Sequence, residues 1–256
     1  MPLDLTEDER YLSAHISDLI ALSLKSGTPR FSSFLNEREA AIAAEAARTE
    51  NAIPVFFGGY GGASRTVCGF FEGTFGVDFA EDARKELFPI SAVSFTFRER
   101  GKLSHRDFLG AIMSLGIKRE TVGDIVTVGG YAAVFCLNAE AELIRGITKV
   151  GNVGVCAEDG LKRPIVKPEP VKFIASVPSL RLDCIVGACA NVSRDKSASL
   201  VKSGQVSADF SVCPEVSRIL AENTVLSIRG YGKFKVSKIV GQSKKGRIRV
   251  EMEKFV

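Results

Sequence analysis

The sequence predicts an α+β protein built from three regions of different character. Capping-box patterns near the N-terminus predict helices, strand and helix periods alternate in the middle, and two short helical patterns precede a basic, β-rich tail. The chain has 256 residues, 45% of them hydrophobic, which is enough for two or three small cores. We place these regions at residues 1–82, 83–162 and 176–256, with a linker at 163–175.

The N-terminal region is predicted to be helical, with a small sheet appended. Thr6 with Glu9 and Asn36 with Glu39 have the spacing of capping boxes, and the first helix should end near Gly27. The next patterns are a strand at 55–57, a glycine-rich turn at 58–62 and a strand at 67–71. No Gly-Lys-Ser/Thr sequence follows the glycines, so we interpret the turn as flexible rather than as a phosphate-binding loop.

The middle region alternates between strand and helix periods. Apolar and polar residues alternate from Val93 to Phe97, which predicts a half-buried strand, and Ser104 with Asp107 opens a helix that ends at Gly116. The later patterns are strands at 124–128 and 131–137 around a two-glycine turn, a helix at 138–147 and a strand near 153–155. The order βαββαβ is that of the ferredoxin-like plait, which RNA-recognition folds also use but which does not assign a function by itself.

The C-terminal region begins after a proline-rich linker and is predicted to contain a helix pair followed by strands. Three prolines disfavour helix within Lys162–Lys172. Apolar residues then recur with helical spacing over Leu182–Ala190. Ser193 is suited to cap a second helix, and Gly204 is suited to end it. That helix should bury one face and present lysines and serines on the other.

The charge of the chain is unevenly distributed. From Ser176 onward there are fourteen Lys and Arg residues against seven Asp and Glu, although the whole chain carries only +4. Residues 229–249 contain eight basic residues and no acidic one, with Tyr231 and Phe234 among them. This asymmetry indicates contact with nucleic acid or another anionic surface; on charge alone, a solvated basic tail is an equal alternative.

Other features favour a cytoplasmic protein without a metal site. No apolar run approaches the length of a membrane span, so we expect neither insertion nor export. The six cysteines form no C-x-x-C pair, and we interpret them as buried, reduced thiols. Neither His15 nor His105 has ligand spacing from a cysteine pair.

The C-terminal motifs resemble the S4 RNA-binding domain, a helix-turn-helix with a small sheet. The similarity is carried by Arg181-Leu182-Asp183, Ser193-Arg194, Gly204-Gln205-Val206 and the run from Ser227 to Phe234. Two positions depart from the family. Glu222-Asn223 stands where the family usually has Gly-Asp, which puts the geometry of that turn in question. Lys233 stands where the family commonly has arginine, so a single ammonium charge replaces a guanidinium that can bind a phosphate through two N–H groups.

Upstream segments extend the similarity to a whole-chain family. Phe57–Tyr60, His105–Gly110, Met113–Glu120 and Gly123–Ile125 look like the YlmH family of bacterial S4-domain proteins. The resemblance implies a cytoplasmic protein that binds ribosomal and transfer RNA on the large ribosomal subunit. It further implies roles in the rescue of stalled subunits that carry peptidyl-tRNA, and in cell division.

We therefore predict a non-enzymatic, monomeric RNA-binding protein that needs no cofactor and does not contact membranes. The helix pair and the sheet should contact phosphates through basic side chains, so that recognition is mainly of RNA shape and backbone. The candidate residues are Arg181, Arg194, Lys196, Lys202, Arg229, Lys233 and Lys235, with His105, Arg106, Lys118 and Arg119 in the middle region. Lys118 and Arg119 could equally complement the helix dipole.

Two other classes of function compete with this interpretation. S4 domains also guide RNA-modifying enzymes, but no glycine-rich cofactor turn follows an opening strand here. The second alternative is a scaffold that docks a protein on an exposed face of the plait sheet.

Overall fold

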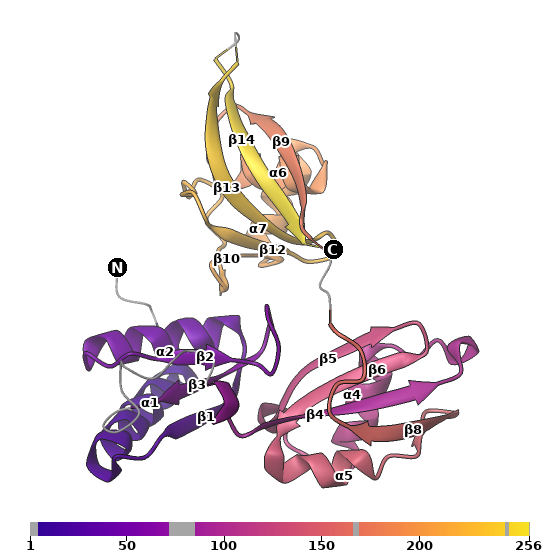
Figure 1. The fold of residues 1–256 in the computed structure, drawn as a ribbon. Helices are drawn as coiled ribbons and strands as arrows, with labels where there is room; N and C mark the ends of the chain where they lie inside the picture. The colour runs from indigo at the N-terminus through magenta and orange to yellow at the C-terminus, as the bar shows by residue number, and fades with distance from the viewer. Residues whose placement is uncertain (1–4, 72–84, 166–168, 244–245, 256) are drawn as a thin grey trace. The chain divides into compact units, whose positions relative to one another are not determined.

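The computed structural model describes residues 5–71, 85–165, 169–243 and 246–255. The expected boundary between residues 82 and 83, and Pro168 of the expected linker, lie outside this set. The chain divides into an N-terminal unit, Met1–Ile165, and a C-terminal unit, Val166–Val256. In its described part the chain is mixed α/β, with helices and sheets in both units (Figure 1).

The first half of the N-terminal unit packs two capped helices on a small antiparallel sheet. Thr6 and Asn36 complete the predicted capping boxes, and Gly27 ends the first helix with φ 62°. The sheet order is β1-β3-β2. The elements are α1 (Glu7–Ser26), β1 (Arg30–Leu35), α2 (Glu37–Thr49), β2 (Val55–Phe57) and β3 (Thr66–Phe70).

Strand β1 is absent from the sequence prediction. Ser32 is buried in this strand, and its hydroxyl accepts the backbone N–H of Cys68 at 2.9 Å. The pairing with β3 also shifts register between Phe31 and Phe34. A shifted register with a polar residue in the core removes the period-two pattern by which strands are recognised.

The second half of the unit has the predicted order βαββαβ, with a short additional strand. The antiparallel sheet has the order β5-β6-β4-β8-β7. Gly129 and Gly130 have φ 44° and 72°, as a two-residue hairpin turn requires. The elements are β4 (Ile90–Phe97), α4 (His105–Met113), β5 (Val122–Val128), β6 (Tyr131–Leu137), α5 (Ala141–Arg145), β7 (Lys149–Val150) and β8 (Val153–Asp159).

One face of this second sheet is covered by helices and the other is covered over β6 and part of β4, whereas the alternation in β4 predicted one exposed face. One face packs against α4 and α5 through a core that includes Phe108, Ile112 and Ile144. On the other face, Phe135 belongs to an apolar cluster with Phe34 of the N-terminal half. The remaining buried members of this aromatic cluster are Val67, Phe71, Phe88, Tyr131 and Ala133.

The C-terminal unit packs a helix pair on one face of a curled antiparallel sheet (Figure 1). Asn191 ends α6 with φ 53°, Ser193 caps α7, and Gly204 follows with φ 68°. The sheet order is β11-β10-β12-β13-β14-β9. The elements are β9 (Val171–Val177), α6 (Leu182–Ala190), α7 (Arg194–Lys202), β10 (Val206–Ala208), β11 (Ser211–Val212), β12 (Val225–Ile228), β13 (Gly232–Gln242) and β14 (Ile248–Phe255).

Two expectations need correction here. Strand β9 lies largely within the expected linker 163–175 and pairs with β14, so the linker is shorter than the prolines suggested. All six cysteines carry free thiols, but only Cys68, Cys136 and Cys213 are buried; Cys184 and Cys189 are half-buried and Cys156 is exposed. Within the described ranges, every helix is too short or too polar to span a bilayer.

Candidate nucleic-acid interface

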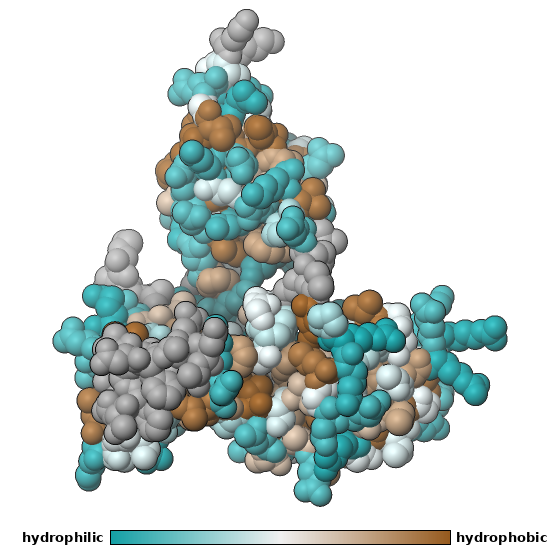
Figure 2. All heavy atoms as spheres, viewed as in Figure 1, coloured by the Kyte–Doolittle hydropathy of each residue, from teal (hydrophilic) through white to brown (hydrophobic). Residues whose placement is uncertain are grey.

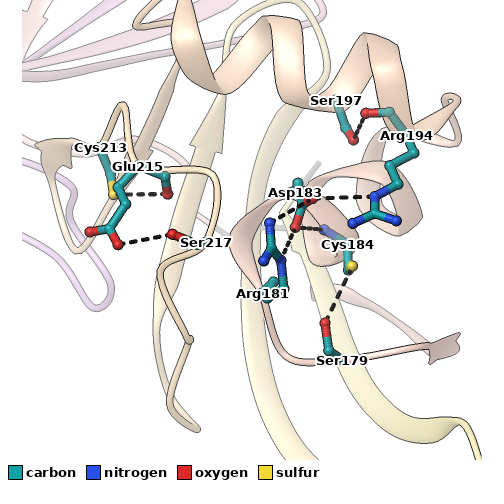
Figure 3. Close-up of polar contacts among 9 residues, drawn as sticks. All are labelled: Ser179, Arg181, Asp183, Cys184, Arg194, Ser197, Cys213, Glu215 and Ser217. Atoms are coloured by element: carbon teal, nitrogen blue, oxygen red, sulfur yellow. Dashed lines mark hydrogen bonds and ion pairs between the residues drawn. The ribbon is translucent and has the colours of Figure 1, made fainter.

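A buried carboxylate, Asp183, holds two arginine side chains at the start of the helix pair (Figure 3). Asp183 lies in the first turn of α6, and its side chain is 3% exposed. Arg181 Nε lies 3.1 Å from Asp183 Oδ1, and Arg194 Nε lies 3.5 Å from Oδ2. The backbone N–H of Cys184 also donates to Oδ1, at 3.0 Å. The Arg194 guanidinium nevertheless reaches solvent, because its side chain is 72% exposed.

Asp183 is ionised at neutral pH in spite of its burial. Burial raises the pKa of this carboxyl, but the hydrogen bonds from Arg181 and Cys184 outweigh burial, so the pKa of Asp183 lies below its usual value. The same contact raises the pKa of Arg181. The Asp183 carboxylate therefore neutralises only part of the charge of Arg181 and Arg194. The net positive charge that remains reaches solvent at the Arg194 guanidinium.

Helix α7 adds two lysines to this layer. Ser193 Oγ accepts the N–H of Lys196 at 3.3 Å, which fixes the first turn of the helix. Lys196 and Lys202 are exposed, as predicted for the polar face. The buried face consists of Ser197, Leu200 and Val201. Together with Arg181 and Arg194, these lysines form a basic surface on the helix layer, which we call the helix-pair surface.

The predicted sheet residues do not extend the helix-pair surface. Phe234 and Val236 face the core beneath the helices, so Lys233 and Lys235, which alternate with them, lie on the opposite face of β13. Figure 2 shows hydrophilic residues over much of this unit on the side turned to the viewer, with a group of hydrophobic residues toward the end of the β13–β14 hairpin. Arg229 is exposed in the turn after β12.

Lys233 makes aromatic contacts on that face. Its Nζ lies 5.5 Å from the ring centroid of Phe210 and 5.4 Å from that of Phe255. Such cation–π contacts direct the ammonium toward protein rings and away from a free phosphate site.

The turn at Glu222-Asn223 forms in spite of its departure from the S4 pattern. Asn223 adopts φ 68°, which asparagine tolerates better than most residues. Its N–H donates to the carbonyl of Val236 at 2.6 Å, and a Glu222 carboxylate oxygen accepts the N–H of Ile239 at 2.7 Å.

Three of the four candidates in the middle region are exposed, and the fourth, Arg119, is hydrogen-bonded within the protein. His105 and Arg106 lie exposed in the first turn of α4, and Lys118 is exposed beyond that helix. Partial burial and then the charge of Arg119 lower the pKa of His105. Arg119 itself is half-buried and donates to two carbonyl groups at the start of β5. Arg119 therefore contacts the protein backbone, whereas the sequence predicted contact with RNA or with the helix dipole.

We expect Arg119→Ala to lower the free energy of unfolding by about 1–2 kcal/mol, because carbonyl groups of β5 lose a charged donor. Lys118→Ala is the matched control and should change it by less than about 0.5 kcal/mol, since that side chain is exposed. Urea unfolding of the two variants compares them directly. Equal effects would contradict the structural role of Arg119.

The glycine-rich turn is held against the middle sheet and is not free. Tyr60 Oη donates to Asp124 Oδ2 at 2.7 Å, and the backbone N–H groups of Ser64 and Arg65 donate to the same carboxylate at 2.7 and 3.1 Å. The Tyr60 ring stacks on Phe135, with centroids 4.8 Å apart. Burial and the bond to Asp124 raise the pKa of Tyr60. We therefore correct the expectation of a flexible turn.

The second face of the middle sheet is only partly free. The aromatic cluster and the Tyr60 turn cover β6 and part of β4 on the face that α4 and α5 leave open. On the same face Thr96, Cys156 and Glu158 are exposed. The scaffold alternative therefore has a smaller exposed surface than an open sheet would give it.

Sequence reasoning missed a basic segment between β4 and α4. Arg98, Arg100 and Lys102 are all exposed there, just before the predicted candidate Arg106. The signal is present in the sequence, because these three residues and Arg106 place four cations within residues 98–106. Across the residues that the structure describes, no cluster of three or more His, Cys, Asp or Glu side chains is arranged to hold a metal ion.

Comparisons with known proteins identify relatives of this chain. A family profile described as "Putative RNA-binding domain in YlmH" matches residues 84–160. The chain is 34% identical over 196 residues to the "Ribosome-associated protein quality control protein P2" of Bacillus subtilis (strain 168), covering 70% of this chain and 76% of that relative.

A solved structure is similar in fold. The "Cell division protein ylmH from Streptococcus pneumoniae" superposes with a TM-score of 0.51 at 20% identity, covering 63% of this chain and 96% of the other. Sequence identity and coverage of the Bacillus relative, together with the profile match, lead to one conclusion: the chain belongs to the YlmH family.

Proposed function

We propose that this protein is a non-enzymatic, monomeric RNA-binding protein of the cytoplasm that acts in ribosome-associated quality control. It would bind ribosomal RNA and tRNA on large subunits that carry stalled peptidyl-tRNA. The name of the Bacillus relative supports the ribosomal role, and the name of the pneumococcal structure supports a link to cell division. The observation that carries the proposal is the pair of arginines oriented by buried Asp183.

We also propose a more specific fold for each region. The middle domain, 83–162, is a ferredoxin-like plait, an assignment supported by the strand order β5-β6-β4-β8 with both helices on one face. The C-terminal domain is an S4 module, supported by its capped helix pair on a small sheet, and β9 extends this domain before residue 176. Residues 1–82 form the remaining domain.

Two surfaces would contact the RNA. The helix-pair surface, together with Arg229 from its exposed turn, would bind phosphates, since basic side chains displace condensed counterions. In the middle domain RNA would contact the exposed basic segment 98–106 and Lys118, since the aromatic cluster covers β6 and part of β4. Recognition of shape and backbone suits both surfaces.

The double variant Arg194→Glu/Lys196→Glu should bind purified large ribosomal subunits about tenfold to a hundredfold more weakly, a loss of about 1.4–2.7 kcal/mol. Co-sedimentation at low and high salt measures the binding. Arg10→Glu/Lys25→Glu on α1 is the control, because it changes the net charge equally with exposed residues of the other unit. Wild-type affinity in the first variant, with the fold intact, would refute the site assignment.

The competing RNA-modifying enzyme is tested separately. RNA that has been incubated with the protein and candidate cofactors is digested and its mass measured. Any protein-dependent mass shift would refute the non-enzymatic proposal. Unchanged masses together with salt-sensitive binding would support it.

A further inference from the structure

A cavity of about 310 Å³ lies in the C-terminal unit beside the Asp183 cluster. Its walls come from both layers, because β9 contributes strand residues, Arg247 stands just before β14, and α6 and α7 contribute helix residues. The apolar part of the lining is formed by Val177, Pro178, Ala188 and Val192. The charged part is formed by Asp183, Arg194 and Arg247.

The charges of this cavity suit an anion at its mouth. Asp183 is already engaged by Arg181 and Arg194, so the carboxylate does not present an unpaired negative charge. Arg194 and Arg247 are both exposed, and Arg247 is held in place by donating from Nη2 to the carbonyl of Ser176 at 2.7 Å. Two guanidinium groups on one rim are suited to a phosphate, which arginine binds through paired N–H donors.

The size and walls of the cavity select for a single nucleotide. A volume of about 310 Å³ is at the lower end of small-molecule sites, and no helical stretch of RNA would fit into it. Apolar walls beside a phosphate-binding rim match a base with its own phosphate. Unpaired bases of structured RNA are the groups that proteins bind in this way.

We propose that this cavity receives one unstacked nucleotide of the RNA, with its base between the apolar walls and its phosphate at Arg194 and Arg247. The inference rests on the proposed RNA-binding function and deepens it, because Arg194 belongs to both the helix-pair surface and the cavity. RNA held on that surface would thus pass the mouth of the cavity. Recognition then includes an unpaired position in addition to backbone shape.

The test compares two labelled RNA hairpins with the full chain. Their stems are identical except that one carries a single bulged 2-aminopurine nucleotide. The bulged hairpin should bind about tenfold more tightly, and its 2-aminopurine should become protected from quenching by acrylamide in the complex. Ala188→Phe fills the cavity and should abolish the preference while leaving affinity for the paired hairpin unchanged. Ala190→Phe, on the same helix but outside the lining, is the matched control and should keep the preference.

The outcomes separate this inference from the function on which it depends. Equal binding of both hairpins by the wild type, with 2-aminopurine still open to quencher, would overturn the cavity assignment and leave RNA binding intact. Failure of both hairpins and of large subunits to bind would overturn the proposed function, and the inference with it. Displacement of the bulged hairpin by free nucleoside monophosphates at micromolar concentration would identify a small-molecule site and would also overturn the inference. Because the quenching measurement uses the wild type, it stands even if Ala188→Phe does not fold.

Discussion

Gly59→Ala is expected to lower the free energy of unfolding of the N-terminal unit by about 2–5 kcal/mol. A Cβ at this position would lie 2.3 Å from Cδ1 and 2.8 Å from Cε1 of Phe135, a ring that is itself buried in the aromatic cluster. Gly59 also has φ 93°, a conformation that residues with side chains rarely adopt. The ring cannot move aside without losing its stack on Tyr60.

Gly61→Ala is the control for this substitution. It lies in the same turn, but a Cβ there meets no atom within 4 Å and its φ is not positive. Its effect should therefore be within about 0.5 kcal/mol. Scanning calorimetry of the full chain compares the two variants. If Gly59→Ala were as stable as Gly61→Ala, the turn would not be docked on Phe135 as described.

Asp183→Ala is expected to lower the free energy of unfolding of the C-terminal unit by about 2–4 kcal/mol, because the backbone N–H of Cys184 and the two arginines lose a charged acceptor. It should also weaken RNA binding about tenfold, although removal of an acidic residue makes the surface more positive. Arginines that are no longer oriented must lose conformational entropy when they bind phosphate.

Asp195→Ala tests whether RNA affinity depends on the orientation of the two arginines or only on the net charge of the surface. Asp195 is exposed in the first turn of α7, so this variant changes the net charge by the same amount without disturbing the cluster. RNA affinity should stay the same or rise, because a repulsive charge is removed. Tighter binding by both variants would show that charge alone governs affinity and would contradict a positioning role for Asp183.

The stability difference between the wild type and Asp183→Ala should also depend on pH. Because the folded-state pKa of Asp183 is depressed, its contribution is complete above the unfolded value near 3.8 and is lost as the pH falls through the folded value. Urea unfolding should therefore show a constant difference from neutral pH down to about pH 4, and a shrinking one below that.

The parts of the fold that the sequence predicts well are those set by local interactions. Thr6, Asn36 and Ser193 accept hydrogen bonds from backbone groups within three residues, so their side chains identify helix starts without knowledge of the tertiary fold. The two-glycine turn in the middle sheet is local in the same sense.

The parts that it does not predict depend on contacts distant in the chain. Ser94 reads as a solvent-facing residue of a half-buried strand, yet it is buried because the Tyr131 hydroxyl lies 2.8 Å from its own. Lys118 and Arg119 are adjacent and of equal charge, and only the position of β5 separates their roles. The buried carboxylate beneath Arg194 was likewise not foreseen, because residues 183 and 194 belong to different helices.

The aromatic cluster also bears on how the protein can be dissected. Phe34 and Phe135 pack in one core, although they belong to regions that sequence patterns divide near residue 82. A fragment such as 84–160, cut to the limits of a family profile, would leave the Phe135 side of this core open to water. The N-terminal unit as a whole keeps both sides of this core together, so the segment expected to unfold cooperatively is larger than the segment that the family profile matches.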